Sequence, residues 1–188
     1  MYPAEAVEQL VRYVCMNGGL SRYIKIRYFF EQILNTAIND TRIEELAHEY
    51  SRIVKDRVIA APSVRGAEEF LASWQGRSAC VIISGSDEQE LQEVCRARGI
   101  SGYFSAIMGS PQTKRENIRR LLEKTSWLAS ECLFIGDSEN DREAASGMGI
   151  PFLARNSGIE PWDGYDGTVL TDLTELEDYL KWYQRSQT

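Results

Sequence analysis

The amino-acid sequence predicts an α/β fold in which a mostly parallel sheet follows a helical segment. Over roughly the first 60 residues, apolar side chains recur at helical spacing and no strand pattern is present. From about residue 62 onward, short apolar runs alternate with helical stretches, which is typical of βαβ units. We therefore expect a helical domain over residues 1–61 and an α/β domain over residues 62–188.

The helical segment is expected to contain three helices. Asn17-Gly18-Gly19 is a stop signal that ends the first of them. Ser21 has the hydroxyl of a typical N-cap for the second helix. Asp40-Thr41 begins the third, whose apolar positions continue to Val58.

The strongest strand signals are two apolar runs that end in small or polar residues. Residues 79–83 lead into Ser84-Gly85-Ser86, and residues 132–135 lead into Gly136-Asp137. Such runs are typical of buried parallel strands. Weaker strands are expected at 104–108, 151–154 and 168–170, and helices at 66–75, 87–98, 113–124, 141–148 and 172–184. Ligands of parallel sheets bind beyond the carboxyl ends of the strands, so both polar motifs lie where a site is expected.

Composition and charge exclude several classes of function. Of the 188 residues 26% are charged, and the formal net charge is −7, so a large basic surface for nucleic acid is not expected. No apolar run approaches the roughly 18 residues of a membrane span, and the acidic N-terminal stretch lacks the apolar region of a signal peptide. The four cysteines form no Cys-x-x-Cys pair, and with one histidine they provide no zinc set. We expect a cytoplasmic protein without nucleic-acid or membrane partners.

The stretch from Gly136 to Asp141 carries the strongest chemical signal. Asp137 lies at a strand tip and Asp141 near the start of the next helix, so two carboxylates flank one turn. Clustered carboxylates repel each other unless a cation joins them, and Mg²⁺ typically takes one or two carboxylates together with phosphate oxygens and water. A helix cap with an acidic first turn explains the same residues. The local chemistry leaves both interpretations open.

Two further motifs suggest an anion site. Ser84-Gly85-Ser86 places a hydroxyl and free backbone amides at a strand end, just before a helix that begins near Asp87. A plain helix cap with a tight turn is the alternative. Lys114 opens a helix on the unfavourable side of its macrodipole, which favours a specific anionic partner. Most lysines are solvated surface residues, however, so each motif is weak on its own.

Taken together and in chain order, these signals resemble motifs two, three and four of the haloacid dehalogenase (HAD) superfamily. They are Ser84 after a strand, then Lys114, then a strand followed by Gly-Asp137-x-x-x-Asp141. The resemblance covers about residues 62–171 and implies a three-layer, Rossmann-like core around a parallel sheet. It implies that Ser84 and the adjacent amides hold a phosphoryl group and that Lys114 neutralises its oxygens. It further implies that Asp137 binds Mg²⁺ and that Asp141 supports the metal site. These roles suit phosphoryl transfer, which depends on positioning and charge neutralisation.

The first 61 residues resemble the small helical cap of the phosphoglycolate phosphatase and β-phosphoglucomutase branch of this superfamily. Gly19-Leu20-Ser21-Arg22, followed by a helix, is similar to a cap loop whose arginine grips a substrate anion. Arg22 is therefore an expected substrate-binding residue. The resemblance implies a small phosphorylated metabolite as the substrate, without identifying it.

The first motif of the family has no counterpart in this sequence. In the family it is a strand that ends in Asp-x-Asp, whose first aspartate attacks phosphorus and whose second is the general acid/base. Residues 1–16 are predicted to be helical, and the 188 residues contain no Asp-x-Asp. We expect a Mg²⁺-dependent phosphatase or phosphomutase in the complete form, and a chain that is inactive because roughly 20–30 residues are missing. The alternative is a degenerate fold that binds a ligand or a protein without catalysis; a dehalogenase or phosphonate hydrolase is less favoured.

The missing first strand has a structural consequence. In HAD folds it lies between the strands that correspond here to residues 79–83 and 132–135. Two strands that flank an absent neighbour would lie about 10 Å apart, whereas a closed sheet would bring them to about 5 Å with ladder hydrogen bonds. The distance between the backbones of Ile82 and Phe134 is therefore expected to distinguish a truncated chain from a self-sufficient degenerate fold.

Overall fold

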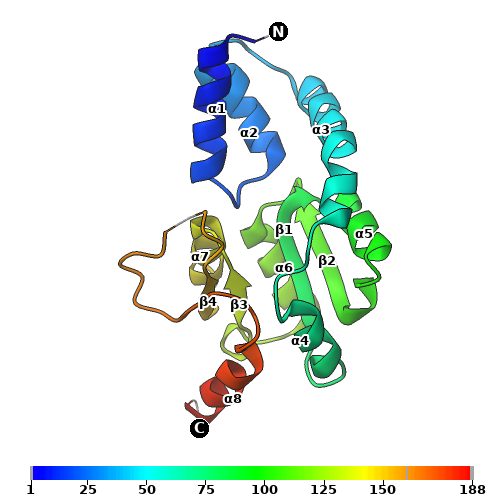
Figure 1. Cartoon of the computed structure of the whole chain (residues 1–188), viewed down its shortest axis with the longest axis vertical. Helices are drawn as coiled ribbons and strands as arrows, with labels where there is room; N and C mark the ends of the chain where they lie inside the picture. Colours follow the sequence, from blue (N-terminus) through cyan, green and yellow to red (C-terminus); the bar gives the residue numbers. More distant parts are fainter. Residues whose placement is uncertain (1, 160, 187–188) are drawn as a thin grey trace.

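The computed structural model describes residues 2–159 and 161–186, and its N-terminal part consists of helices joined by short loops (Figure 1). Helices α1 (Ala4–Met16), α2 (Arg22–Tyr28) and α3 (Asp40–Ala60) lie together above the strands, and we call them the helical layer. A π-helical turn, Phe29–Ile33, extends α2. Ser21 caps α2 as predicted, by accepting a hydrogen bond from the amide of Ile24. The division of the chain at residue 61 stays a prediction.

The remainder alternates strands and helices, and all of its strand pairs are parallel. The strands are β1 (Cys80–Asp87), β2 (Phe104–Ser110), β3 (Phe134–Gly136), β4 (Phe152–Arg155) and β5 (Val169–Leu170). The helices are α4 (Ala67–Trp74), α5 (Glu88–Ala97), α6 (Lys114–Thr125), α7 (Glu139–Ser146) and α8 (Leu176–Ser186), with short 3₁₀ turns at Ser101–Tyr103 and Ala129–Glu131. The predicted α/β class with a parallel sheet is confirmed.

The strands form two separate sheets. The first sheet contains β1 and β2, and the second contains β3, β4 and β5 in that order. Among the described residues no backbone ladder joins β1 to β3, so one edge of each strand is without a strand partner. The closed sheet, with a ladder between the strands of Ile82 and Phe134, is therefore not what this chain forms.

Side chains and helices connect the two sheets. Helix α6 packs on β1 and β2, α7 packs on β3 and β4, and the two helices pack on each other. Ile118 of α6 and Ala145 of α7 are buried together, and Ile83 of β1 and Phe134 of β3 both pack against this cluster. A second cluster, centred on Leu153, Leu170 and Leu176, lies under the second sheet. The core therefore spans the two sheets although the backbone ladder does not.

Most predicted element boundaries agree with the structure to within about two residues, and the largest differences lie at the end of β1 and the start of α8. β1 continues through residues 84–86 to Asp87, with its register shifted against β2 between Ile83 and Asp87. Ile83 pairs with Met108 and Asp87 with Ser110, so extra residues of β1 form an irregular, bulge-like stretch. The last helix begins at Leu176 because the side chain of Asp172 binds the backbone and hydroxyl of Thr174 and holds a turn there. Within the described ranges, no helix is both long and apolar enough to cross a membrane.

Candidate active site

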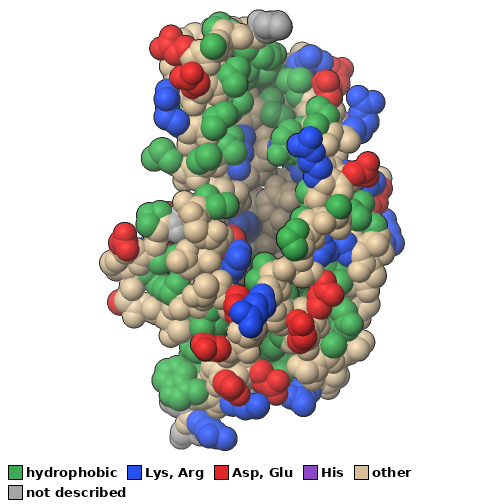
Figure 2. Space-filling model, viewed as in Figure 1, with side chains coloured by type: hydrophobic (Ala, Val, Ile, Leu, Met, Phe, Trp, Pro, Cys, Tyr) green, Lys and Arg blue, Asp and Glu red, His purple; other side chains and the backbone are tan. Residues whose placement is uncertain are grey.

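A cavity of about 770 Å³ lies between the helical layer and the two sheets. It is visible as a hollow in the middle of the molecular face in Figure 2. All seven residues that the sequence analysis selected line it, from four different segments of the chain. Its lining includes Gly18, Gly19, Leu20, Arg22, Lys25, Ile82, Ile83, Ser84, Gly85, Ser86, Lys114, Ile135, Gly136, Asp137, Asp141 and Arg155.

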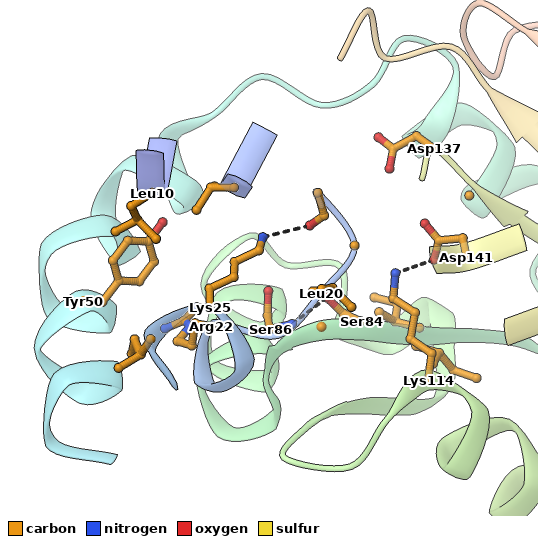
Figure 3. A pocket seen from close by; sticks show the side chains of 18 of the residues that line it. Leu10, Leu20, Arg22, Lys25, Tyr50, Ser84, Ser86, Lys114, Asp137 and Asp141 are labelled. Atoms are coloured by element: carbon orange, nitrogen blue, oxygen red, sulfur yellow. Dashed lines mark hydrogen bonds and ion pairs between the residues drawn. The ribbon is translucent and has the colours of Figure 1, made fainter. Parts of the chain in front are cut away.

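Lys114 and Asp141 form a buried ion pair that bridges the two halves of the α/β part. Lys114 is the first residue of α6, and its Nζ donates to Oδ1 of Asp141 at 2.6 Å (Figure 3). The two side chains are only 7% and 10% exposed. Because α6 packs on the first sheet and α7 on the second, this pair crosses between them. It also explains why a lysine occupies the first turn of a helix.

The turn after β3 holds Asp141 through a capping box. Ser138 is the N-cap of α7, and its hydroxyl donates to Oδ2 of Asp141 at 2.6 Å while its amide donates to the same oxygen at 3.2 Å. Gly136 makes room for this packing, since a Cβ at that position would lie 2.4 Å from Cβ of Asp141. Both carboxylate oxygens of Asp141 are thus engaged, and the side chain has a defined orientation.

Asp137 is the more accessible of the two carboxylates. It follows the last residue of β3, and its side chain is 46% exposed. Its Oδ2 accepts a hydrogen bond from Nη1 of Arg155 at 3.3 Å, which joins the carboxyl ends of β3 and β4. Asp137 and Asp141 are the carboxylates that line the cavity among the described residues.

The end of β1 contributes hydroxyls and backbone to the opposite wall of the cavity. Oγ of Ser84 accepts a hydrogen bond from the amide of Ser86 at 3.1 Å, which fixes the irregular stretch seen in the β1–β2 register. The loop between α1 and α2, which contains Gly19 and Leu20, lies directly over this stretch. A Cβ at Gly85 would lie 2.7 Å from the carbonyl oxygen of Gly19, and a Cβ at Gly19 would lie 2.9 Å from Nζ of Lys114. Two glycines therefore allow the loop to approach the ion pair.

Arg22 lines the cavity, but its guanidinium is bound by the protein itself. Nη1 of Arg22 donates to Ser51 of α3 and to Oε2 of Glu90 of α5, and the guanidinium lies 4.9 Å from the centre of the Tyr50 ring. Arg22 and Glu90 are almost completely buried. This contact ties the helical layer to the first sheet.

A second contact of the same kind involves Tyr23. Its hydroxyl donates to Oδ2 of Asp87, at the end of β1, at 2.8 Å. Burial, together with the hydrogen bond to Asp87, raises the pKa of Tyr23 to about 12. The helical layer is thus held to the end of β1 by a neutral phenol as well as by the Arg22–Glu90 pair.

Two further residues, Ser138 and Arg155, shape the site. Ser138 and Asp141 form the Ser-x-x-Asp pattern of a capping box, so the sequence did contain a signal for Ser138. Arg155 carries no local signal, because it meets Asp137 only through the pairing of two strands that are separated in sequence.

The donor set offers little to a metal ion beyond Asp137. No group of three His, Cys, Asp or Glu side chains that could hold a metal occurs in the part of the chain that the structure describes. Asp141 is engaged by Lys114 and Ser138. One accessible carboxylate of hard oxygen atoms suits Mg²⁺, an ion that often keeps several of its waters.

A serine, a lysine and two aspartates thus line one cavity at the carboxyl ends of parallel strands, the edge at which α/β proteins bind their ligands. The family model of haloacid dehalogenase-like hydrolases matches residues 4–149. The chain therefore belongs to this family, and the resemblance noted in the sequence is confirmed.

Individual relatives agree with this assignment. The chain is 28% identical over 97 residues to a phosphoglycolate phosphatase of Synechococcus elongatus, a match that covers 50% of this chain and 46% of that protein. The chain thus matches about half the length of this curated relative. The structure of a predicted phosphoglycolate phosphatase from Haemophilus somnus superposes with a TM-score of 0.72 at 14% identity, over 94% of this chain and 87% of that one. A predicted phosphatase from Clostridium acetobutylicum gives 0.69 at 16% identity, over 95% and 91%. At these identities the two structures show a shared fold.

Proposed function

We propose that this chain forms the phosphoryl-binding core of a Mg²⁺-dependent phosphatase that acts on a small phosphorylated metabolite. The observation that carries the proposal is the convergence of Ser84, Lys114, Asp137 and Asp141 on one cavity at the carboxyl ends of β1 and β3. A cavity at this edge of a parallel sheet is the usual place for a ligand. Membership of a hydrolase family and the phosphatase named among the relatives support the same activity.

We propose a role for each of these side chains. The hydroxyl of Ser84 and the backbone amides of Gly85 and Ser86 would donate hydrogen bonds to phosphoryl oxygens. Lys114 would neutralise the negative charge that phosphoryl transfer concentrates on those oxygens. Asp141 holds the ammonium group of Lys114 in place, which makes it a positioning residue.

Asp137 is the proposed protein ligand of Mg²⁺. When bound, the ion would neutralise phosphoryl oxygens and help to orient the substrate. Both carboxylate oxygens of Asp141 accept hydrogen bonds from Lys114 and Ser138, so Asp141 would support the metal site without binding the ion directly. With one direct carboxylate, water has to fill most of the octahedron, and the affinity for Mg²⁺ in this chain should be weak.

The nucleophile is the part of the reaction that this chain does not provide in our proposal. A carboxylate nucleophile on a strand between β1 and β3 would reach the cavity beside Lys114 and Asp137. Both β1 and β3 line the cavity, and each has one edge without a partner among the described strands, so their free backbone groups would offer hydrogen bonds to such a strand. Because the 188 residues contain no Asp-x-Asp, we expect no turnover by the chain alone.

A restored enzyme tests this proposal. An apolar strand that ends in Asp-x-Asp, followed by a short linker, would be joined in front of the chain. Hydrolysis of a generic aryl phosphate should then depend on Mg²⁺ and should be abolished by Asp137→Asn and by Lys114→Met. An exposed lysine variant, Lys181→Met, is the control. A restored protein that folds but remains inactive would count against the phosphatase.

A non-catalytic binding module is the second candidate function. It is favoured by the absence of Asp-x-Asp and by the pairing of both cavity aspartates with cations of the protein itself. The restored protein distinguishes the two candidates, because a binding module gains no activity from the added strand. A phosphomutase would form the same phosphoryl site but transfer the group to a second hydroxyl.

The substrate class is proposed from the cavity and the relatives. Phosphoglycolate is the first substrate to test, since one relative is named as its phosphatase. We propose that residues 1–61 form a cap that sets substrate choice, with Arg22 at the substrate site. Arg22→Ala in the restored enzyme should raise KM for the native metabolite more than for an aryl phosphate. Equal effects on both would remove Arg22 from that role.

A further inference from the structure

Arg155 occupies an unusual place beside the proposed metal ligand. It is the last residue of β4, and the pairing of Gly136 with Ala154 puts Asp137 and Arg155 next to each other at the carboxyl ends of adjacent strands. Its Nη1 lies 3.3 Å from Oδ2 of Asp137. Leu153 and Ala154 are fully buried, so the backbone that carries Arg155 is firmly held.

The guanidinium is only partly satisfied by this contact. Its Nε is buried and has no hydrogen-bond partner within the described part of the protein. A buried N–H donor without an acceptor is unfavourable, and an arginine fork binds an oxyanion with two parallel hydrogen bonds. Arg155 also lines the cavity that holds Ser84 and Lys114. Arg155 thus combines a donor that has no partner among the described residues with a place in the lining of the cavity where an anion is expected.

We propose that Arg155 and a divalent cation compete for Asp137, and that the guanidinium released by the cation binds phosphate in the same cavity. The inference rests on the proposed function for the assignment of Asp137 to the metal. A guanidinium and a divalent ion repel each other when they share one carboxylate. Once the ion takes Asp137, Arg155 lacks a counter-charge on that side and attracts an anion.

The competition predicts coupled binding. In the metal-free protein the Arg155–Asp137 pair weakens the binding of Mg²⁺, because the pair must be broken first. When phosphate accepts the released guanidinium, the binding of Mg²⁺ becomes more favourable, and the coupling is reciprocal. Asp172 is another carboxylate that senses Arg155: its pKa is lowered first by its hydrogen bonds to Thr174 and to a smaller extent by Arg65 and Arg155. Its Oδ1 already accepts both bonds from Thr174.

The test is a titration of the full 188-residue chain with MgCl₂, followed by NMR at the amides of Gly136 and Asp137, with and without inorganic phosphate. Without phosphate, Arg155→Met should bind Mg²⁺ at least about fivefold more tightly than the wild type, the lower end of typical coupling. Phosphate should strengthen the binding of Mg²⁺ in the wild type. The ratio of the Kd values for Mg²⁺ without and with phosphate should be at least about fivefold smaller in Arg155→Met. Arg119→Met, which removes an exposed arginine paired with Glu123 on α6, should behave like the wild type.

The outcomes separate this inference from the proposed function. If Asp137→Asn abolishes the binding of Mg²⁺ while Arg155→Met leaves it at the wild-type value, the inference is overturned and the metal site stands. If Asp137→Asn binds Mg²⁺ like the wild type, both fail. Arg155→Lys guards against a folding defect: it keeps the charge but loses the fork, so it should lose most of the phosphate coupling. Full coupling in a folded Arg155→Lys variant would also overturn the inference.

Discussion

Strands β4 and β1 both begin with a run of apolar residues but have very different surroundings. β4 has a strand on both sides, β3 and β5, and its central residues Leu153 and Ala154 are completely buried. β1 pairs with β2 alone among the described strands, and all of its eight residues are only half-buried, including Ile82 and Ile83. β3, which faces β1 across the cavity, is also half-buried along its length.

This difference indicates where the sheet is interrupted. Parallel strands with continuous apolar sequence normally have both faces and both edges covered. A strand that is apolar yet half-exposed has apolar surface and backbone groups for which the described residues offer no partner strand. β1 and β3 both have this property, and they carry Ser84 in the carboxyl-terminal half of β1 and Asp137 directly after β3, so the interruption passes through the candidate site.

The largest effect is expected from the ion pair that crosses the interruption. Asp141→Asn leaves the ammonium group of Lys114 buried without a counter-charge, which typically costs about 3–5 kcal/mol when one partner of a buried pair is removed. Urea unfolding should show a loss of this size. Glu123→Gln, in the exposed Arg119–Glu123 pair, is the matched control and should leave stability nearly unchanged. If Asp141→Asn lost no more free energy of unfolding than Glu123→Gln, the pair would not hold the two sheets together.

A smaller loss is expected where the second sheet meets α7. Gly136→Ala would place a Cβ within 2.4 Å of Cβ of Asp141, so the turn after β3 must shift. Overpacking of this kind typically costs about 1–3 kcal/mol. Gly102→Ala is the control, because a Cβ there meets nothing within 4 Å. Equal midpoints of thermal unfolding for the two variants would contradict the close packing of Asp141 on β3.

On the side of β1, the contact between Tyr23 and Asp87 predicts a dependence on pH. The pKa of Tyr23 is about 12 in the folded protein and 10.0 for an ordinary tyrosine. A raised pKa stabilises the folded state below pH 10, and this contribution is lost as the pH rises toward 12. Between these values the wild type should therefore lose more free energy of unfolding than Tyr23→Phe. Parallel pH profiles for the two proteins would rule out this role of the phenol.

The smallest effect on stability is expected at Ser84. Ser84→Ala removes one partly exposed hydrogen bond to the amide of Ser86, worth about 1 kcal/mol or less. Its effect on phosphate binding should be larger, roughly tenfold, because a hydrogen bond to a charged group is stronger. Ser105→Ala removes a hydroxyl that donates to the carbonyl of Cys80, and it should not alter phosphate binding. Calorimetric titration with phosphate compares the two, and equal affinities would exclude Ser84 from the anion site.

The sequence predicted the parts of this fold that local patterns encode. The apolar runs located β1 and β3, and the polar residues after them located both walls of the cavity, because parallel strands bring their carboxyl ends to one edge. Ser21, the N-cap of α2, and Asp40, the first residue of α3, marked the starts of these helices correctly. Such signals depend on neighbours in the chain.

Long-range partners could not be predicted in the same way. Arg22 and Glu90 are 68 positions apart, and they meet because α2 packs on α3 and α3 packs on α5. Arg155 meets Asp137 through the register of β3 and β4. Charges that the sequence suggested for a substrate are therefore partly engaged within the protein, and this could not be known before the strands and helices were placed.

The central claim is that the phosphoryl-binding residues are in place while the nucleophile is not part of this chain. An assay of aryl phosphate hydrolysis by the purified 188-residue protein, with saturating Mg²⁺, tests it most directly. The account predicts background hydrolysis that is the same for the wild type and Asp137→Asn. Mg²⁺-dependent turnover by the wild type that Asp137→Asn abolishes would contradict it, because a nucleophile would then lie among these residues.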